Sequence, residues 1–506
     1  MIDQQALAAA LGQLVSLSAL KFLLIGTIIG LVFGVIPGLG GTTAIALLTP
    51  ITFAMEKYDA IILMAGIMAS TPTSGAVTAI LINTPGTAPN AATCLDGYPM
   101  AKQGKAGLAI GASSMASGIG GLLGIAFLIA VIPVTREIVL LFKPPEFFLL
   151  AVLGLVSVAV STQDRLLRGL IVGGFGLLVS FIGYESVTGE VRYDFGIEYL
   201  WDGLKLVPAM IGLFAIAEMI NLWAKGGSIV EDPSKQRIDF RQVLAGCWAP
   251  FKHWGTTLRG SAIGTLIGAL PGVGGTVAAF LAYTVAIGVS KDPQSFGKGN
   301  IVGVIAPESA NNAKEGGSLV PTLAFGIPGS AEMAVFLGVL VLHGLAPGPT
   351  IVIEHMDIIW TLILALTVAG ALASIITLGS ARWLAKLTLI DSRTLVPVVI
   401  AFALIGSYSL NNEILDVFVS LGFGILGFVF MRLGFPRLTL PIALVLGQIM
   451  ETSYLQSLRI GDGTLKIFVT SWPSRILIFC ILLSIFLPAL KYLYNSLRSR
   501  PQQAKG

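Results

Sequence analysis

The sequence predicts an all-α polytopic membrane protein, built from two homologous repeats whose helices are broken or re-entrant. Three observations support this prediction: the composition, the recurrence of apolar runs, and a glycine-rich motif that occurs twice. Of the 506 residues, 55% are hydrophobic and 11% are Asp, Glu, Lys or Arg, whereas a soluble domain carries about 25% charged residues. The mean hydropathy is +0.87. Only a bilayer accommodates so much apolar sequence.

Apolar runs recur along the whole chain, as expected for a protein that crosses a membrane many times. Clear examples lie at residues 19–36, 107–132, 170–181 and 477–490. Because one spanning helix needs about 20 apolar residues, we expect about ten to twelve membrane segments.

One motif occurs in both halves of the chain. GTIIGLVFGVIPGLGGT at residues 26–42 and GSAIGTLIGALPGVGGT at residues 260–276 are identical at nine of 17 positions. Further pairs follow in the same order, such as NTPGT at residues 83–87 and GIPGS at residues 326–330. Such ordered repetition indicates a duplicated unit. We predict four segments: a first membrane repeat at 1–224, a polar linker at 225–259, a second membrane repeat at 260–473, and an extra C-terminal helix with a basic tail at 474–506.

The distribution of charge predicts how the repeats are oriented. The linker contains six Lys or Arg, and residues 491–506 contain four and no acid, so both are expected in the cytoplasm. The second half then crosses an even number of times, and removing its unmatched last helix leaves a repeat with an odd number. An odd unit copied in tandem is inverted, as in many carriers.

The shared motif should break a helix, because proline and three glycines fall within five residues at 37–41 and again at 271–275. In lipid such a break is tolerated only where the backbone lines a cavity, and paired breaks indicate a substrate site. The second half-helix would present unpaired N–H groups that favour an anion. A kink between helices without a ligand is the alternative. The candidate binding residues are Gly38, Gly40, Gly41, Thr42, Gly272, Gly274, Gly275 and Thr276.

A second pair of motifs, at residues 83–87 and 326–330, contains Pro-Gly flanked by polar or hydroxyl residues. Small polar clusters at residues 70–75 and 316–318 lie upstream and are predicted to be further interruptions near the same cavity. Simple surface turns are the alternative. This pair adds the candidates Thr73, Ser74, Asn83, Thr84, Gly86, Thr87, Gly329 and Ser330.

The most polar insert of the second half is PESANNAKEGG at residues 307–317. A carboxylate at membrane depth is a functional candidate by default. Glu308 or Glu315 is therefore predicted to bind a coupling ion, H⁺ or Na⁺, with Asn311 and Asn312 supplying oxygen ligands. A solvated loop is the alternative, and no corresponding carboxylates occur in the first half.

These motifs together resemble the large membrane subunit of the tripartite tricarboxylate transporters, the TctA family. The resemblance rests on GxxPGxGGT in both halves, TSGAVTAILINTPG at 73–86, GYPMAKQGKAG at 97–107, APESANNAKEGG at 306–317 and LAFGIPGSAEMA at 323–334. It covers roughly residues 15–490.

The resemblance implies a secondary active transporter of the bacterial inner membrane that imports small carboxylates such as citrate. A periplasmic solute-binding protein and a small membrane subunit would be its partners, and a Na⁺ or H⁺ gradient would drive it without any other cofactor.

Other functional classes have little support in the sequence. The phosphate-binding loop of an ATPase, the H-E-x-x-H pair of a zinc protease and the G-x-S-x-G elbow of a hydrolase are all absent. We therefore expect no catalytic residues and no metal other than Na⁺. The net charge of +4 forms no basic stripe for nucleic acid. A passive anion channel stays an alternative, although duplicated halves favour alternating access.

Overall fold

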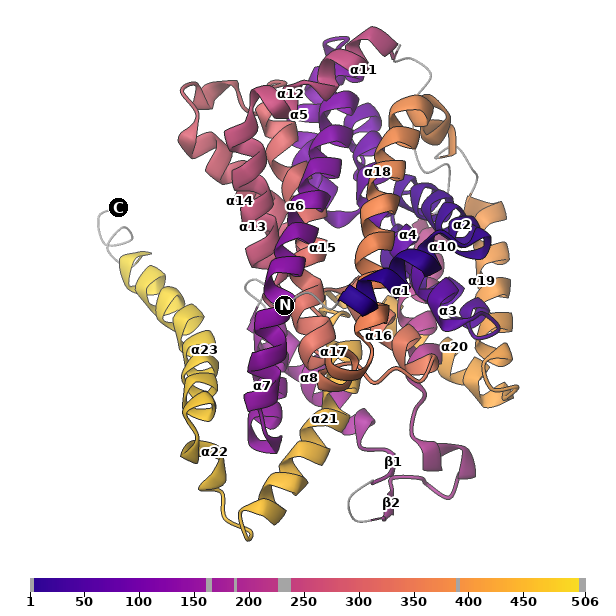
Figure 1. Cartoon of the computed structure of the whole chain (residues 1–506), viewed down its shortest axis with the longest axis vertical. Coiled ribbons are helices and arrows are strands. Elements are labelled where there is room, and N and C mark those ends of the chain that lie inside the picture. Colours follow the sequence, from indigo (N-terminus) through magenta and orange to yellow (C-terminus); the bar gives the residue numbers. More distant parts are fainter. Residues whose placement is uncertain (1–3, 161–165, 186–188, 226–237, 388–391, 500–506) are drawn as a thin grey trace. The chain divides into compact units, whose positions relative to one another are not determined.

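The computed structural model describes residues 4–160, 166–185, 189–225, 238–387 and 392–499 (Figure 1). The described chain is almost entirely helical and forms two compact units. Unit 1 comprises Met1–Val139 and Lys205–Arg432, and unit 2 comprises Leu140–Leu204 and Leu433–Gly506. Each unit thus draws helices from both halves of the sequence. The boundaries of the two repeats stay a prediction.

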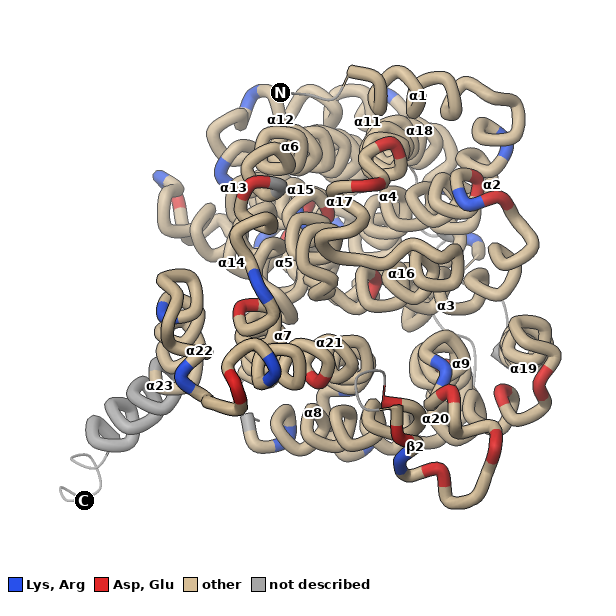
Figure 2. Tube along the Cα trace, turned by 60° about the horizontal axis from the view of Figure 1, so that its bottom comes forward, with Lys and Arg blue, Asp and Glu red and all other residues tan. Residues whose placement is uncertain are grey.

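The expected all-α polytopic class is confirmed. Among the described residues, six helices are long and apolar enough to cross a bilayer, and several shorter apolar helices accompany them. The six are Leu17–Val35, Lys57–Ile82, Ala106–Leu141, Leu206–Ala224, Met356–Leu384 and Ile414–Leu433. Figure 2 shows that most of the trace is free of Lys, Arg, Asp and Glu, as burial in lipid or in protein requires. The number of crossings itself stays a prediction.

Unit 1 contains most of the helices that carry the repeated motifs. From the first half it contains α1 (Gln4–Leu14), α2 (Leu17–Val35), α3 (Gly40–Thr52), α4 (Lys57–Ile82), η1 (Ala88–Asn90), α5 (Ala91–Lys102), nearly all of α6 (Ala106–Leu141), α9 (Leu206–Met210), the π-helical turn η3 (Ile211–Ile216) and α10 (Ala217–Lys225). From the linker and the second half it contains α11 (Phe240–Cys247), α12 (Ala249–Lys252), α13 (Trp254–Gly268), α14 (Gly274–Val289), η5 (Pro293–Ser295), α15 (Val302–Phe325), α16 (Ala331–Leu342), α17 (Pro349–Glu354), α18 (Met356–Lys386), α19 (Ser392–Ser409) and nearly all of α20 (Ile414–Leu433).

Helices α4 and α15 form the centre of unit 1, and each is covered by the glycine face of a neighbour. On α2, Gly26 and Gly30 lie directly against the backbone of α4; a Cβ atom at Gly30 would lie 2.7 Å from Ile67 O. On α13, a Cβ atom at Gly260 would lie 2.6 Å from Ala306 O on α15. Small residues permit this close approach of membrane helices. The first three glycines of each motif are therefore packing residues.

The two helix pairs pack in the same way, residue for residue. Gly26, Gly30 and Gly34 meet Leu63, Ile67 and Thr71, whereas Gly260, Gly264 and Gly268 meet Ala306, Ala310 and Lys314. Each contact in the second set lies 243 positions after its counterpart, the same spacing that separates NTPGT from GIPGS. Thr71 of α4 and Lys314 of α15 thus occupy equivalent positions.

The polar clusters at residues 70–75 and 316–318 do not interrupt their helices, contrary to expectation. Helix α4 continues through Pro72, and α15 continues through Pro307 and Pro321. The small residues of these clusters instead contact the neighbouring helices α2 and α13: Ser74 lies under Gly34, and Gly317 lies against the Thr265 carbonyl. Close packing, rather than a break, explains their composition.

The two longest helices, α6 and α18, each pack against the central helix of the other half. Helix α6 of the first half packs against α15, with Gly120 and Gly124 against the backbone at Ser309 and Ala313. Helix α18 of the second half packs against α4. In the linker, residues 226–237 lie outside the described residues, and α11 packs on the start of α6 through Gly111 and Gly246.

Unit 2 contains α7 (Pro144–Val160), α8 (Leu166–Ser180), the antiparallel pair β1 (Gly183–Tyr184) and β2 (Val191–Arg192), η2 (Glu198–Asp202), α21 (Thr439–Ile460), α22 (Ile467–Thr470) and α23 (Trp472–Ser499). Helices α7 and α8 pack against α21. Buried Glu146 accepts hydrogen bonds from Ser471 Oγ (2.5 Å) and Ser474 Oγ (2.6 Å), which ties the start of α23 to α7.

The glycine contact between α6 and α15 predicts a stability difference between two alanine variants. Gly124→Ala would place its Cβ 2.9 Å from Ala313 Cα, so we expect a loss of about 1–3 kcal/mol of unfolding free energy. Gly422→Ala, on α20 with nothing within 4 Å of its Cβ, should gain about 0.5–1 kcal/mol because alanine favours a helix. Thermal unfolding of both variants in one detergent measures the difference. Equal unfolding temperatures would contradict this packing.

Candidate functional site

Both predicted helix breaks are present in unit 1. Helix α2 ends at Val35 and α3 begins at Gly40, whereas α13 ends at Gly268 and α14 begins at Gly274. Gly38 and Gly40 have φ values of 90° and 58°, and Gly272 and Gly274 have values of 76° and 75°. These left-handed conformations strain any residue with a Cβ, which explains the glycines.

The half-helices that follow the breaks begin without a side-chain cap. The residues before them, Leu39 and Val273, accept no side-chain hydrogen bond from the first turn, whereas Ser330 caps α16 by accepting from Met333 N at 3.3 Å. The helices begin at Gly40 and Gly274, two residues before the threonines of the motif. Uncapped N–H groups at a helix start favour an anionic ligand.

The breaks meet equivalent surroundings, assembled from both halves. A Cβ atom at Gly41 would lie 3.4 Å from Thr71 Oγ1 on α4 and 2.5 Å from Glu332 Oε1 on α16. A Cβ atom at Gly275 would lie 2.5 Å from Lys314 Cε on α15 and 3.1 Å from Pro89 Cγ.

Pro89 and Glu332 are themselves 243 positions apart, as are Thr71 and Lys314. Each break therefore faces the central helix of its own half and the segment after the Pro-Gly motif of the other half. The packing of α3 against α16 and of α14 against η1 produces this exchange.

Lys314 carries the positive charge of this region. It lies beside the second break, is 4% exposed, and pairs with Glu315 and, at 3.3 Å, with Glu332 Oε2. Among the Lys and Arg side chains that the structure describes, Lys314 alone is buried. A buried cation needs partners, because desolvation of an unpaired charge costs several kcal/mol. Two carboxylates here share one cation.

Glu308 lies two helical turns before Glu315 and is fully buried. Its Oε1 accepts from Asn90 Nδ2 at 3.0 Å and from the Thr93 hydroxyl, and its Oε2 accepts from Ser117 Oγ at 3.0 Å. These donors belong to η1, α5 and α6 of the first half. Glu308 thus joins α15 to the first half, and both of its oxygens are satisfied.

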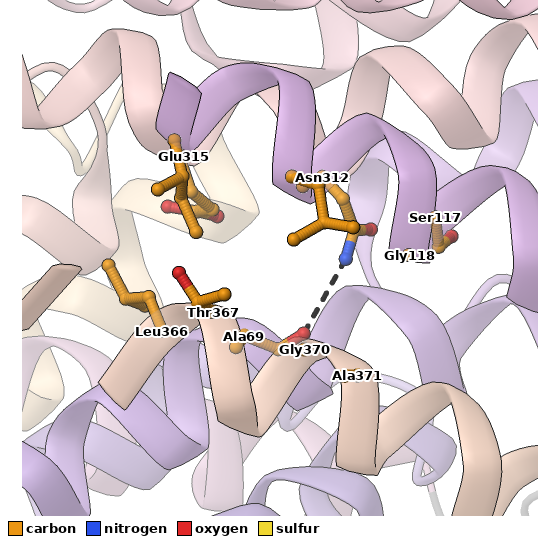
Figure 3. A pocket seen from close by; sticks show the side chains of 12 residues that line it. Ala69, Ser117, Gly118, Asn312, Glu315, Leu366, Thr367, Gly370 and Ala371 are labelled. Atoms are coloured by element: carbon orange, nitrogen blue, oxygen red, sulfur yellow. Dashed lines mark hydrogen bonds between the residues drawn. The ribbon is translucent and has the colours of Figure 1, made fainter. Parts of the chain in front are cut away.

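A pocket adjoins Glu315 between α4, α6, α15 and α18 (Figure 3). It is lined by Ala69, Ser117, Gly118, Gly121, Leu122, Ile125, Asn312, Glu315, Leu366, Thr367, Gly370 and Ala371. Asn312 Nδ2 donates to Thr73 Oγ1 at 3.2 Å and to Ala69 O at 3.5 Å. Asn312 Oδ1 and Glu315 Oε2 are buried without a hydrogen-bond partner among the described residues, as are both side-chain polar atoms of Asn311. Figure 3 shows the Thr367 hydroxyl pointing from α18 toward the Glu315 carboxylate.

The remaining predicted site residues fall into two groups. Around the breaks, exposed Gly38 lies 3.1 Å (from a Cβ position) from Glu218 Oε1, Gly40 lies 3.9 Å from Thr87 Cγ2, and Thr42 and Thr276 are half-buried at the helix starts. The second group makes contacts with the backbone. Asn83 is the exposed C-cap of α4 and Ser330 caps α16, whereas Thr84 Oγ1 donates to Ile82 O and Ser74 Oγ donates to Thr71 O. Gly86 and Gly329 pack against Gly34 and Gly268.

The insert at residues 307–317 is part of buried helix α15, not a solvated loop. Sequence reasoning did not assign Lys314, Glu332, Thr71, Glu218 or Thr367 to the site. A signal for Lys314 was available, because a basic residue inside an apolar segment marks a functional site by default. The positions of Glu332 and Thr367 depend on contacts between the halves, which no local pattern reveals.

Comparison with known proteins identifies the family of the chain. The model of the tripartite tricarboxylate transporter TctA family matches residues 20–442. The chain belongs to this family. It is therefore the large membrane subunit of a tripartite transporter, and the family is one of transporters rather than enzymes. Membership implies a periplasmic binding protein and a small membrane subunit as partners.

Two relatives come from Agrobacterium vitis. One, named "Uncharacterized 52.8 kDa protein in TAR-I ttuC' 3'region", is 34% identical over 451 residues, covering 88% of each chain. The other, "Uncharacterized protein in TAR-II ttuC' 3'region", is 38% identical over 208 residues, covering 41% of this chain and 86% of the relative. No solved structure gives a significant match.

The contact between Gly275 and Lys314 predicts the effect of a larger side chain at the second break. Gly275→Val would displace the Lys314 side chain. We therefore expect this variant to stay folded in the membrane but to lose uptake of the transported substrate. Gly41→Val should act likewise through Glu332. Gly288→Val is the matched control, because Gly288 lies on the same helix α14 with nothing within 4 Å of its Cβ. Near-normal uptake by both break variants would contradict a site at the breaks.

Proposed function

We propose that this subunit imports a small carboxylate across the bacterial inner membrane by ion-coupled alternating access, with substrate supplied by a periplasmic binding protein. The observation that carries the proposal is the convergence of two uncapped helix starts and the buried Lys314 on one region of unit 1. Such a region offers both dipolar and fully charged attraction to an anion.

The chemistry of these groups favours a carboxylate over a neutral solute. Glycine lets the backbone of each break approach a ligand closely, and the first-turn N–H groups of α3 and α14 provide donors of the kind that bind anions. Lys314 adds a compact ammonium group with three donors. Citrate or a related organic acid with several carboxylates would use both breaks at once.

Ion coupling through the polar residues of α15 supports uphill import. Glu308, Asn311, Asn312 and Glu315 lie within two turns on one buried helix, next to Lys314. Carboxylate and amide oxygens are suitable ligands for a hard cation such as Na⁺, and a carboxylate also binds H⁺. No group of three or more His, Cys, Asp or Glu that could hold a metal ion occurs among the described residues.

Inverted repeats would supply the two access states. The equivalent segments α5 and α16 lie toward opposite ends of unit 1 in Figure 1, and the contacts at the two breaks have matching partners. This arrangement supports an inverted relationship, in which exchanging the conformations of the two halves changes the side from which the site is open.

The proposal predicts how transport depends on the partners. In vesicles, the complete tripartite complex should take up a small carboxylate at low concentration, whereas the large subunit without its binding protein should need far more substrate. The same vesicles test the carrier mechanism: preloaded substrate should accelerate entry of labelled substrate. Equal apparent affinity with and without the binding protein would count against the partner role. Flux without any such exchange would indicate a channel.

The orientation of the halves predicts a difference in the accessibility of the two chain ends. In a variant with Cys94, Cys247 and Cys480 replaced by serine, a cysteine at position 5 should react from the periplasmic side. A cysteine at position 502, beyond the described residues, should react from the cytoplasmic side. A membrane-impermeant maleimide applied to intact and to inverted vesicles measures this. Labelling of both from one side would favour parallel repeats.

A further inference from the structure

The pocket beside Glu315 has the chemistry of a small cation site. Its lining combines one carboxylate, one side-chain amide and the hydroxyls of Ser117 and Thr367 with small and large apolar residues. Asn312 and Glu315 are each only 5% exposed. Asn312 Oδ1 and Glu315 Oε2 have no hydrogen-bond partner among the described residues. Buried acceptors without a partner are rare, because leaving them unsatisfied costs free energy. A bound cation coordinated by these oxygens would remove that cost.

We propose that Na⁺ binds in this pocket between Glu315, Asn312 and Thr367, and that its binding releases Lys314 to receive the substrate carboxylate. This inference rests on the proposed function and specifies its coupling step.

The hydroxyl orientation at Thr367 fits a role as a cation ligand. Thr367 Oγ1 donates its hydrogen to Ile363 O at 2.7 Å, so its lone pairs remain for a cation. Asn312 is oriented by its amide group: Nδ2 donates to Thr73 Oγ1 and Ala69 O, so Oδ1 is the atom left as an acceptor. Three oxygen-bearing residues from α15 and α18 therefore line one pocket and offer acceptors to a cation.

The identity of the ion follows from charge and ligand type. One carboxylate is available, and its other oxygen already pairs with Lys314. That single shared charge suits a monovalent cation, whereas Ca²⁺ sites use several carboxylates. An amide oxygen contributes to binding Na⁺ but takes no proton at neutral pH. Glu308 is the less suitable carboxylate, because Asn90, Thr93 and Ser117 satisfy both of its oxygens.

The connection to the substrate runs through Lys314. With all three groups ionised, Lys314, Glu315 and Glu332 carry a net charge of −1 beside the second break. That charge opposes the entry of a carboxylate. Na⁺ on Glu315 brings the sum to zero and competes with Lys314 for the Glu315 carboxylate. Lys314, whose alkyl chain lies against Gly275, is then free to pair with an anion at the break. Cation and substrate therefore bind cooperatively, and each favours the other by the same factor.

Sodium binding to the purified full chain, without substrate or partners, tests the site directly. Uptake of radioactive sodium ion in a scintillation proximity assay, with choline replacing Na⁺ to keep ionic strength constant, measures the affinity. Glu315→Gln and Thr367→Val should each weaken Na⁺ binding by roughly tenfold or more. Thr361→Val is the matched control, because Thr361 lies on the same helix and donates to Asp357 O at 2.8 Å but does not line the pocket. Its affinity should match that of the unmodified protein.

Lys314→Gln separates the proposed release from a purely structural role. Removal of the competing ammonium should tighten Na⁺ binding several-fold, while binding of citrate or another tricarboxylate, measured by calorimetry in saturating Na⁺, should be lost. The thermal unfolding temperature of each variant shows that it is folded. A folded Lys314→Gln that binds Na⁺ more weakly than the unmodified protein overturns the competition between Lys314 and Na⁺.

The outcomes distinguish this inference from the proposed function. Carboxylate uptake that needs no Na⁺, or Na⁺ binding that survives Glu315→Gln and Thr367→Val but is lost in Glu308→Gln, overturns the inference and leaves carboxylate import intact. Sodium binding as described, with no carboxylate uptake by the complete complex, overturns the proposed function and leaves the cation site.

Discussion

The contact of glycine faces with the backbones of α4 and α15 is the constraint on which the site depends. Gly26, Gly30 and Gly34 bring α2 so close to α4 that the helix break after Val35 falls beside Thr71. The same approach of α13 to α15 places the second break beside Lys314. A bilayer offers no hydrophobic driving force between helices, so close van der Waals packing has to fix these positions. The polar centre is therefore placed by residues that have no polar side chains.

The two helix pairs pack alike but differ in charge at equivalent positions. Thr71 and Lys314 occupy equivalent positions, as do Pro89 and Glu332, and every charged member belongs to the second half. The packing can repeat because the glycines contact backbone atoms of the facing helix, and these contacts do not depend on which side chain that helix carries. The charges cannot repeat without cost, because a second buried lysine at position 71 would face no added carboxylate. Both halves contain a helix break, whereas Lys314, Glu315 and Glu332 all belong to the second half.

The parts of the fold that the sequence predicts are those governed by local backbone chemistry. The breaks follow from proline and glycine, and their φ values show why only glycine serves at Gly38 and Gly272. The all-α membrane class follows from composition. The polar clusters around Ser74 and Ser318 misled the interpretation, because small polar residues mark close packing as readily as interruption. The exchange that sets Glu332 beside Gly41 joins residues 291 positions apart, and the pocket between Asn312 and Thr367 needs α18 to cross to the first half. No periodicity in either segment carries that information.

Under the proposed import mechanism, burial of Lys314 would also limit the leakage of ions. An ammonium group in a low-dielectric region cannot be left alone, so it pairs either with Glu315 and Glu332 or with an anion that has entered. Any state in which the site changes its accessible side with Lys314 unpaired lies several kcal/mol higher than the paired states. The change of accessible side is therefore favoured in two states: the empty protein, in which Lys314 pairs with Glu315 and Glu332, and the fully loaded protein. A half-loaded protein, with substrate but no counter-ion for Glu315, adds the negative charge of the substrate to the net charge of −1 that the empty site already carries, and the desolvation of this larger charge holds it back. The two allowed states are those that the proposed coupled import requires, and the free-energy cost of an isolated buried charge selects them.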